Sequence, residues 1–172
     1  MKPRLTLIAA IDKNRLLSNE KGFPWHQPKD VAHFRAYTAN KWLLIGRRTY
    51  EEMIGWFREG HVPLILTRQT DYKAEVGQVV GSVEEALRLT EAAGQSELVC
   101  VGGGKVFETC LPYADLLVLT EIPHRFNLGE KPVFFPPWSD DDWKVDKRQD
   151  IPHDAENVHD MTISYWVRAS AE

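Results

Sequence analysis

Short apolar runs alternate along the chain with longer segments whose apolar residues recur at helical spacing. The runs are rich in Leu, Ile and Val and end at glycine or polar residues, a pattern typical of buried strands. They predict strands at residues 5–10, 42–45, 62–67, 78–80, 98–101 and 116–122. Because strands that alternate with helices favour parallel pairing, the pattern predicts an α/β fold.

Helix-start and helix-stop residues place the helices between these strands. Pro28 suits the first position of a helix that runs to about residue 39, and Ser82 and Gly94 suit the two ends of another. Further helices are predicted at 47–53 and 105–111. Irregular connections are predicted at 12–22 and 131–143, and a closing antiparallel hairpin at 143–150 and 161–167.

The chain length and composition suit one domain. The 172 residues, 43% of them hydrophobic, can bury one proper core but not two. We therefore expect a single domain over residues 1–172, α/β in class. Its mostly parallel central sheet should end in the antiparallel C-terminal hairpin and carry helices on both faces.

Charge and cysteine content narrow the class of partner. The formal net charge of −4 argues against a nucleic-acid or anionic-membrane surface, so we expect a small-molecule partner. We also expect a monomer. The apolar run that Asp12 closes is too short for a membrane span and does not resemble a signal peptide. Cys100 and Cys110 show neither a disulfide framework nor zinc spacing, which favours a reducing, cytoplasmic location.

Two segments repeat the order strand, glycine, basic residue, helix: LLIGRRTYEEM from Leu43 and VCVGGGKVFETC from Val99. A glycine at a strand end lets a ligand approach the backbone, and the following helix start offers free N–H groups. Neither segment is a Rossmann fingerprint or a P-loop. Tight turns without a ligand remain an alternative for each segment, but two such ends on one sheet favour a dinucleotide.

Three arginines bear on which dinucleotide it is. Arg47 and Arg48 open one predicted helix, and Arg68 follows Thr67 at the end of a strand. Arginine beside a hydroxyl suits a phosphate monoester on a ribose, the group that separates NADP from NAD. Each arginine could instead be solvated, but their convergence on one sheet edge favours the phosphate.

Asp30 lies in the aromatic stretch FPWHQPKDVAHF. An acid in the first turn complements the helix dipole by roughly 0.3–1 kcal/mol and occurs on many surface helices. The alternative is that Asp30 and Phe34, one turn apart, face a pocket walled by Phe23 and Trp25.

Other catalytic arrangements are disfavoured. The stretch HDAENVHD at 153–160 is polar, lies between two predicted strands and has no further ligand cluster, so we predict no metal site there. No Ser-His-Asp or Cys-His arrangement has a recognisable context.

Taken in order, these motifs resemble the dihydrofolate reductase family of the chromosomal type over essentially the whole chain. The resemblance rests on LIAAIDKNRLL, FPWHQPKDVAHFR, LLIGRRTYEEM, LILTRQ, VGGGKVF and LLVLTEI. It implies an NADPH-dependent oxidoreductase that reduces 7,8-dihydrofolate to tetrahydrofolate for one-carbon metabolism. Hydride would reach pterin C6 and a proton N5, and antifolate inhibitors are expected ligands.

The resemblance also implies roles for individual residues. Asp30 would hold the pterin ring, Thr120 would support its hydrogen bonding, and Trp25 would order a water; these are the catalytic candidates. Burial should raise the pKa of Asp30, and Gly102–Gly103 should be a cis pair. The substrate-binding candidates are Ala10, Phe23, Asp30, Val31, Phe34, Arg35, Met53, His61, Val101 and Thr120. The cofactor-binding candidates are Ala10, Leu17, Gly46, Arg47, Arg48, Thr49, Leu66, Thr67, Arg68, Val101, Gly102, Gly103, Gly104, Lys105, Val106 and Phe107.

One position departs from the family pattern. His61 stands where the family has an arginine that grips the substrate's glutamate tail, and Arg35 and Arg58 are alternatives for that role. Three other functions stay open, the first of them because of His61. They are reduction of another dihydropterin such as dihydromethanopterin, reduction of a riboflavin-pathway pyrimidine, and nucleotide binding without catalysis. The helix sequence PWHQPKD favours a pterin over the pyrimidine.

Overall fold

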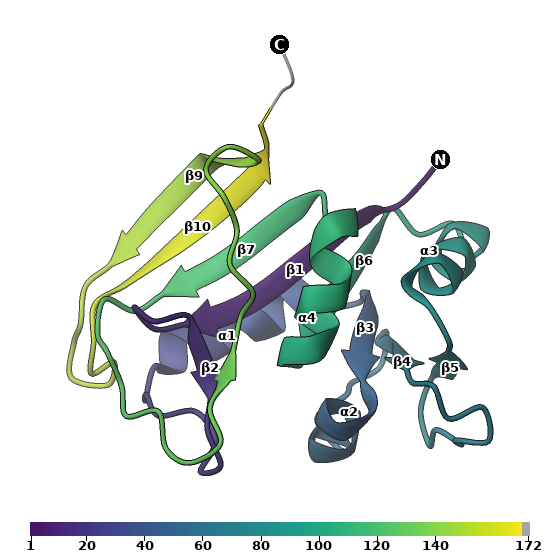
Figure 1. Cartoon of the computed structure of the whole chain (residues 1–172), viewed down its shortest axis with the longest axis horizontal. Helices are drawn as coiled ribbons and strands as arrows, with labels where there is room; N and C mark the ends of the chain where they lie inside the picture. Colours follow the sequence, from purple (N-terminus) through teal and green to yellow (C-terminus); the bar gives the residue numbers. More distant parts are fainter. Residues whose placement is uncertain (170–172) are drawn as a thin grey trace. The chain divides into compact units, whose positions relative to one another are not determined.

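The computed structural model describes residues 1–169, which form ten strands, four α-helices and one 3-10 turn (Figure 1). The helices are α1 (Pro28–Thr38), α2 (Arg47–Met53), α3 (Val83–Ala92), α4 (Gly104–Cys110) and the 3-10 turn η1 (Leu111–Tyr113). The strands are β1 (Arg4–Ile11), β2 (Leu16–Ser18), β3 (Trp42–Gly46), β4 (Val62–Leu66), β5 (Gln78–Val80), β6 (Glu97–Gly102), β7 (Leu116–Glu121), β8 (Val133–Phe134), β9 (Trp143–Ile151) and β10 (Met161–Arg168).

The main sheet has eight strands in the order β5-β4-β3-β6-β1-β7-β10-β9. Pairing is parallel from β5 through β4, β3 and β6 to β1, and antiparallel from β7 through β10 to β9. The predicted α/β class is therefore confirmed, with its mostly parallel sheet and antiparallel C-terminal hairpin. No helix among residues 1–169 is long and apolar enough to cross a membrane.

The connections predicted to be irregular each contain a strand. β2 and β8 pair antiparallel, with Leu16 opposite Phe134. Each strand is too short to show a period, and its partner lies far away along the sequence, so a local pattern could not reveal either one.

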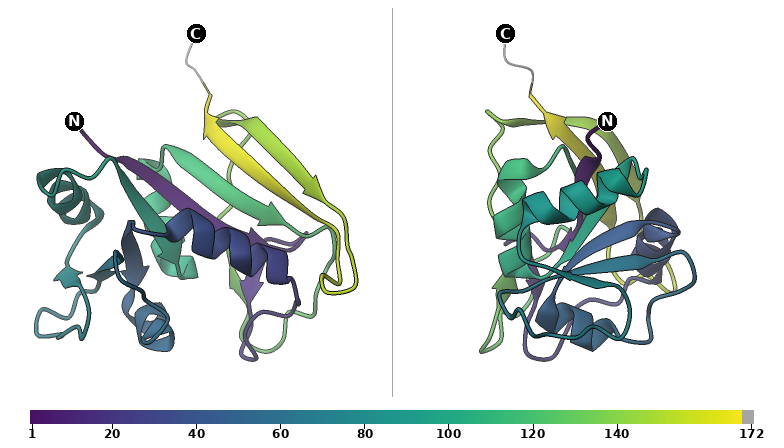
Figure 2. Two further views of the ribbon diagram at one scale, coloured as in Figure 1. Left: turned by 180° about the vertical axis from the view of Figure 1, so that it is seen from behind. Right: turned by 90° about the vertical axis from the view of Figure 1, so that its right-hand side faces the viewer.

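The chain folds into two compact units. The first unit contains residues 1–7 and 37–114. Within it α2 packs on β3 and β4, α3 on β5 and β6, and α4 on β6 and β3 (Figure 2). The side chains of Leu43, Leu44, Leu64, Leu98 and Val99 are fully buried and form much of its core. Cys100 and Cys110 are buried there as free thiols.

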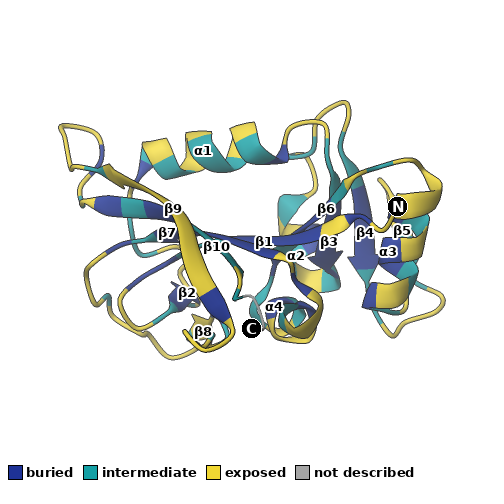
Figure 3. Cartoon of the chain, turned by 90° about the horizontal axis from the view of Figure 1, so that it is seen from above, coloured by how far each residue is buried: buried dark blue, intermediate teal, exposed yellow. Residues whose placement is uncertain are grey.

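The second unit contains residues 8–36 and the chain from Asp115 onward. Helix α1 runs along one face of its strands (Figure 3). Leu117, Leu119, Phe135 and Ile163 contribute to its buried apolar interior.

Candidate functional site

The second unit brings Asp30 and Thr120 together. Asp30 lies in the first turn of α1, and Thr120 lies on β7 with 1% of its surface exposed. Burial raises the pKa of the Asp30 carboxyl, and a hydrogen bond from the Thr120 hydroxyl partly opposes that rise. The expected direction of the pKa change is thus found in the structure, with desolvation as its larger cause.

A row of aromatic rings precedes α1 in the same unit. Trp25 stacks on Phe23 with ring centroids 6.1 Å apart and tilts against Phe126 at 5.4 Å. Phe23 is 74% exposed, so its ring forms surface, and Trp25 is half-buried. The Trp25 ring is therefore fixed on both sides by other rings close to the start of the helix that carries Asp30.

In the first unit, two strands that end in glycine lie side by side. β3 and β6 pair in parallel with Ile45 opposite Gly102, and helices α2 and α4 begin directly after them. The peptide bond between Gly102 and Gly103 is cis, as the family resemblance implied. The turns that follow β3 and β6 therefore lie at the same edge of the sheet, as the sequence predicted.

Close packing by itself accounts for glycine at these turns. A Cβ on Gly46 would lie 2.8 Å from Val106 Cγ2, and one on Gly103 would lie 3.0 Å from Thr49 Oγ1. Gly102 has a φ of +112°, and its Cβ would lie 2.9 Å from the Phe107 ring. Protein atoms thus occupy the space that each missing side chain leaves, so these glycines are needed whether or not a ligand binds.

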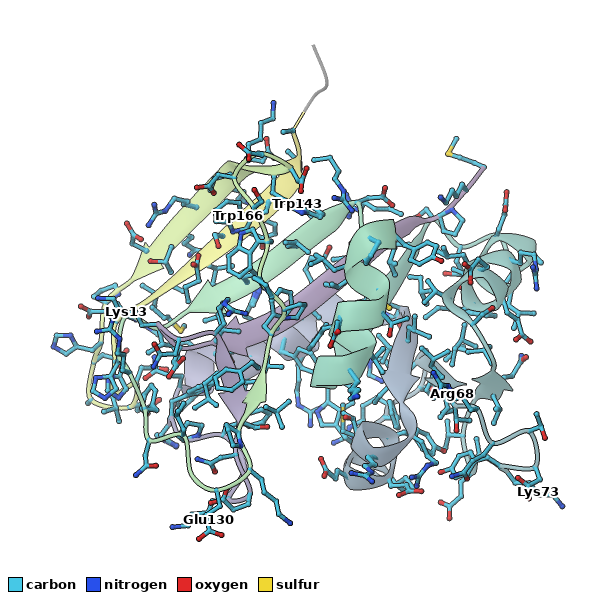
Figure 4. All side chains as sticks on the ribbon, viewed as in Figure 1. Lys13, Arg68, Lys73, Glu130, Trp143 and Trp166 are labelled. Atoms are coloured by element: carbon cyan, nitrogen blue, oxygen red, sulfur yellow. The ribbon has the colours of Figure 1, made fainter. Side chains whose placement is uncertain are left out.

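The three arginines predicted to bind the cofactor phosphate differ in their partners. Arg47 Nη1 pairs with Glu51 Oε1 at 3.0 Å, and the Tyr72 hydroxyl donates to the same oxygen at 3.3 Å. The guanidinium groups of Arg48 and Arg68 form no hydrogen bond or ion pair within residues 1–169 (Arg68 is labelled in Figure 4). Arg48 and Arg68 are therefore better candidates than Arg47 for an ion pair with the phosphate of an NADP-type dinucleotide.

The structure divides the remaining candidates between the two units. In the second unit Val31 and Arg35 are exposed on α1, and Phe34 is half-buried there. Ala10 is half-buried in β1, and Leu17 is buried in β2. The candidates in the first unit are Thr49, Met53, His61, Leu66, Thr67, Val101, Gly104, Lys105, Val106 and Phe107.

Two of these first-unit residues have a packing role. Met53 and Val101 pack against the buried cluster of Ile45, Tyr50 and Ile65, which explains their apolar character without a ligand.

His61 and Arg58 are held by their own segment. The Arg58 backbone N–H donates to His61 Nδ1 at 2.8 Å, and the imidazole stacks on Trp56 at 5.1 Å between centroids. Arg58 Nη1 donates to the carbonyl oxygens of Gly55, Trp56 and Phe57. Because Nδ1 accepts this hydrogen bond, it cannot at the same time donate one to a substrate carboxylate.

The sequence reasoning missed the role of residues 152–160. No group of three or more His, Cys, Asp or Glu side chains within residues 1–169 could hold a metal ion. Instead, Asn157 Oδ1 accepts the Lys29 N–H at 2.9 Å and so caps α1. Asparagine is a preferred N-cap residue, but nothing local indicates which helix a distant residue caps.

Comparison with known proteins agrees with this geometry. The family profile described as dihydrofolate reductase matches residues 4–168. Dihydrofolate reductase of Bacillus subtilis (strain 168) is 30% identical over 167 residues, which cover 97% of this chain and 96% of the relative. Dihydrofolate reductase type 3 of Salmonella typhimurium is 35% identical over 155 residues, covering 90% and 92%.

A solved structure extends the similarity to three dimensions. Dihydrofolate reductase from Enterococcus faecalis, complexed with NADP(H) and RAB-propyl, aligns with a TM-score of 0.86 and 29% identity. The alignment covers 97% of both chains. With a family profile that spans nearly the whole sequence, this chain belongs to the dihydrofolate reductase family.

Proposed function

We propose that this chain reduces 7,8-dihydrofolate to 5,6,7,8-tetrahydrofolate with NADPH. The observation that carries the proposal is the half-buried Asp30 carboxyl, hydrogen-bonded by Thr120 in a chain whose family match covers residues 4–168. Bound NADPH would supply the hydride that pterin C6 receives, so the protein itself needs no nucleophile.

Asp30 is the group to which we assign recognition of the pterin. A carboxylate accepts hydrogen bonds, and the 2-amino group and ring N3 of a dihydropterin can donate them. These donors would offset the desolvation that raises the pKa of Asp30. We assign Asp30 to orienting the ring and water to delivering the proton to N5, with Trp25 ordering that water.

The remaining substrate contacts are assigned by the family resemblance. Ala10, Val31, Phe34 and Met53 would line the ring and its tail. Phe23 and Leu17 would belong to the segment that covers the cofactor.

Arg48 and Arg68 are our candidates for the ribose phosphate of NADPH. Both guanidinium groups lack a partner within residues 1–169, whereas Glu51 neutralises Arg47. A charge-assisted bidentate contact with phosphate is among the stronger hydrogen bonds available to a protein. Gly102, Gly103 and the start of α4 are assigned to the diphosphate and nicotinamide.

The decisive experiment follows the loss of NADPH absorbance with dihydrofolate as substrate. Saturable oxidation that needs both reactants supports the proposal, and the Asp30→Asn variant should lose it while still binding NADPH. A wild-type protein that binds NADPH but oxidises it with no dihydropterin would instead support a nucleotide-binding module without catalysis.

A second candidate substrate is a dihydropterin without the glutamate tail. It is favoured because His61 Nδ1 accepts a hydrogen bond and Arg58 Nη1 is occupied by three carbonyl oxygens. Comparing dihydrofolate with dihydropteroate, which lacks the glutamate, separates the two candidates. A kcat/KM at least about tenfold higher for dihydrofolate would mean that another group, such as Arg35, grips the tail.

We also propose that the 172 residues act as one monomeric domain in the cytoplasm, without a nucleic-acid or membrane partner. The free, buried Cys100 and Cys110 suit a reducing compartment. Light scattering and a single cooperative unfolding transition would test the monomer and the single domain.

A further inference from the structure

The turn between β9 and β10, residues 152–160, lies against the start of α1. The Gln27 side chain donates to the His159 carbonyl oxygen and accepts the His159 N–H, both at 2.7 Å. Asn157 Oδ1 accepts the Lys29 N–H at 2.9 Å, and Lys29 Nζ pairs with Asp154 Oδ2 at 2.9 Å. All of these residues belong to the second unit. The turn thus holds the helix on both sides of Pro28, directly before Asp30.

These contacts account for the N–H groups of the first helical turn, which have no partner within a helix. Pro28 has no N–H, and the Lys29 N–H goes to Asn157. The N–H groups of Asp30 and Val31 donate to the Gln27 carbonyl oxygen at 3.0 and 3.3 Å. The position of the helix start therefore depends on Gln27 and Asn157.

Both side chains are buried, Gln27 to 3% and Asn157 to 1% exposure. A buried amide is costly unless its hydrogen bonds are made. The Asn157 amide uses both ends, because Nδ2 donates to Asp154 Oδ1 at 3.0 Å while Oδ1 caps Lys29. Its orientation is therefore fixed on one side by Asp154 and on the other by the helix.

Helix α3 shows that the chain can cap a helix locally. There the Ser82 hydroxyl, next to the helix, accepts the Glu85 N–H at 3.1 Å. Helix α1 takes its cap from a buried residue of another segment, so the cap also fixes where the helix start lies relative to β9 and β10. Thr120 lies on β7, which pairs with β10, and the Asp30–Thr120 hydrogen bond needs this placement.

We propose that Asn157 is a positioning residue for the Asp30 carboxyl, acting through its cap on Lys29, and that Gln27 shares this role. The pair keeps Asp30 where the Thr120 hydroxyl can donate to it and where the substrate ring can meet it. The inference rests on the proposed function, because that function assigns the pterin to Asp30.

The direct test is a carbon-13 NMR titration of the Asp30 carboxyl in the full-length protein without substrate. Burial and the Thr120 hydrogen bond set the pKa of Asp30, and both depend on where the helix start lies. Asn157→Ala is therefore expected to change that pKa by more than the error of the titration. A pKa equal to that of the wild type would overturn the proposal.

The second test is kinetic. Asn157→Ala should lower kcat/KM for dihydrofolate about three- to tenfold, mainly through KM, the range expected from one lost capping hydrogen bond. The KM for NADPH should not change, because none of the cofactor candidates lies in residues 152–160 or at the start of α1. Gln27→Ala should give the same selective loss and provides an independent variant.

Ser82→Ala is the matched control, because it removes one N-cap from a helix that does not carry Asp30. It should lower stability comparably and leave both the Asp30 pKa and the dihydrofolate kinetics unchanged. If Ser82→Ala and Asn157→Ala altered dihydrofolate kinetics equally, Asn157 would have only a general structural role. A wild type that does not reduce dihydrofolate would overturn the proposed function, while the NMR titration would still decide the positioning role.

Discussion

The Thr120 hydroxyl donates a hydrogen bond to the Asp30 carboxyl and so connects strand β7 to the first turn of α1. Burial raises the pKa of Asp30, and this hydrogen bond lowers it. Any further hydrogen-bond donor that a ligand brings would stabilise the ionised form of this carboxyl. The first two predictions follow from that balance.

Asp30→Asn should reduce turnover of dihydrofolate at neutral pH by at least about 100-fold, the loss expected when a reacting ring is no longer correctly oriented. Asparagine keeps the shape but removes the negative charge that we assign to the pterin donors. NADPH affinity, measured by fluorescence titration, should be unchanged. Turnover close to that of the wild type would contradict the role of Asp30.

The same variant should be more stable than the wild type at neutral pH. The folded state raises the pKa of Asp30 above its ordinary value of 3.8, so the folded protein binds this proton more tightly than the unfolded chain. The wild type therefore loses stability as pH rises through the folded pKa and the buried carboxyl ionises. Below the ordinary value the carboxyl is protonated in both the folded and the unfolded state and costs no stability. Thermal unfolding should give a higher Tm for Asp30→Asn at about pH 7 and a smaller difference below about pH 4.

Arg68→Gln should weaken discrimination between NADPH and NADH. Because the Arg68 guanidinium has no partner within residues 1–169, its removal breaks no internal ion pair. Losing one charged hydrogen bond to the ribose phosphate should raise the KM for NADPH roughly tenfold or more and leave that for NADH unchanged. Arg88→Gln, on α3 of the same unit, is the control and should alter neither value.

Glu20→Gln should loosen the link between two loops of the second unit. The Glu20 carboxylate accepts the N–H groups of Glu130 at 3.0 and 3.1 Å and of Lys131 at 2.9 Å (Glu130 is labelled in Figure 4). Glutamine presents one acceptor fewer, so hydrogen exchange at these two amides should become faster. Glu130→Gln changes a neighbouring exposed side chain without removing the acceptor and should have little effect.

The same contact should depend on pH. Hydrogen bonds from the Lys131 and Glu130 backbone lower the pKa of Glu20 below its ordinary value of 4.5. The stabilisation is therefore present above that value and is lost as pH falls through the folded pKa. Exchange at the two amides of the wild type should accelerate in that acidic range, and a rate independent of pH after correction for intrinsic exchange would contradict the contact.

Gly46→Ala should destabilise the protein by about 1–3 kcal/mol through overpacking. The φ of Gly46 is −74°, which alanine adopts freely, so the cost comes from the 2.8 Å approach to Val106 Cγ2. Val106→Ala should therefore recover much of the loss in the double variant, as measured by denaturant unfolding. Additive losses would show that Val106 is not the cause.

Local sequence patterns were enough to predict most of the elements. The strand predicted at 42–45 is β3 (Trp42–Gly46), and the helix predicted from Pro28 is α1 (Pro28–Thr38). Apolar periodicity, a proline at the helix start and an N-cap serine act over a few residues, so each can be read from its neighbours. The direction of the Asp30 pKa change also followed from its aromatic and apolar surroundings.

The sequence by itself thus determined the elements, the glycine-ended strands and the kinds of side chain available to a ligand. Only the tertiary structure paired β2 with β8, joined Thr120 to Asp30 and made Asn157 the cap of α1. It also showed that Arg47 is neutralised while Arg48 and Arg68 have no partner within residues 1–169. Hydrogen bonds and ion pairs between distant segments depend on where the chain returns in space, and no spacing along the sequence records that.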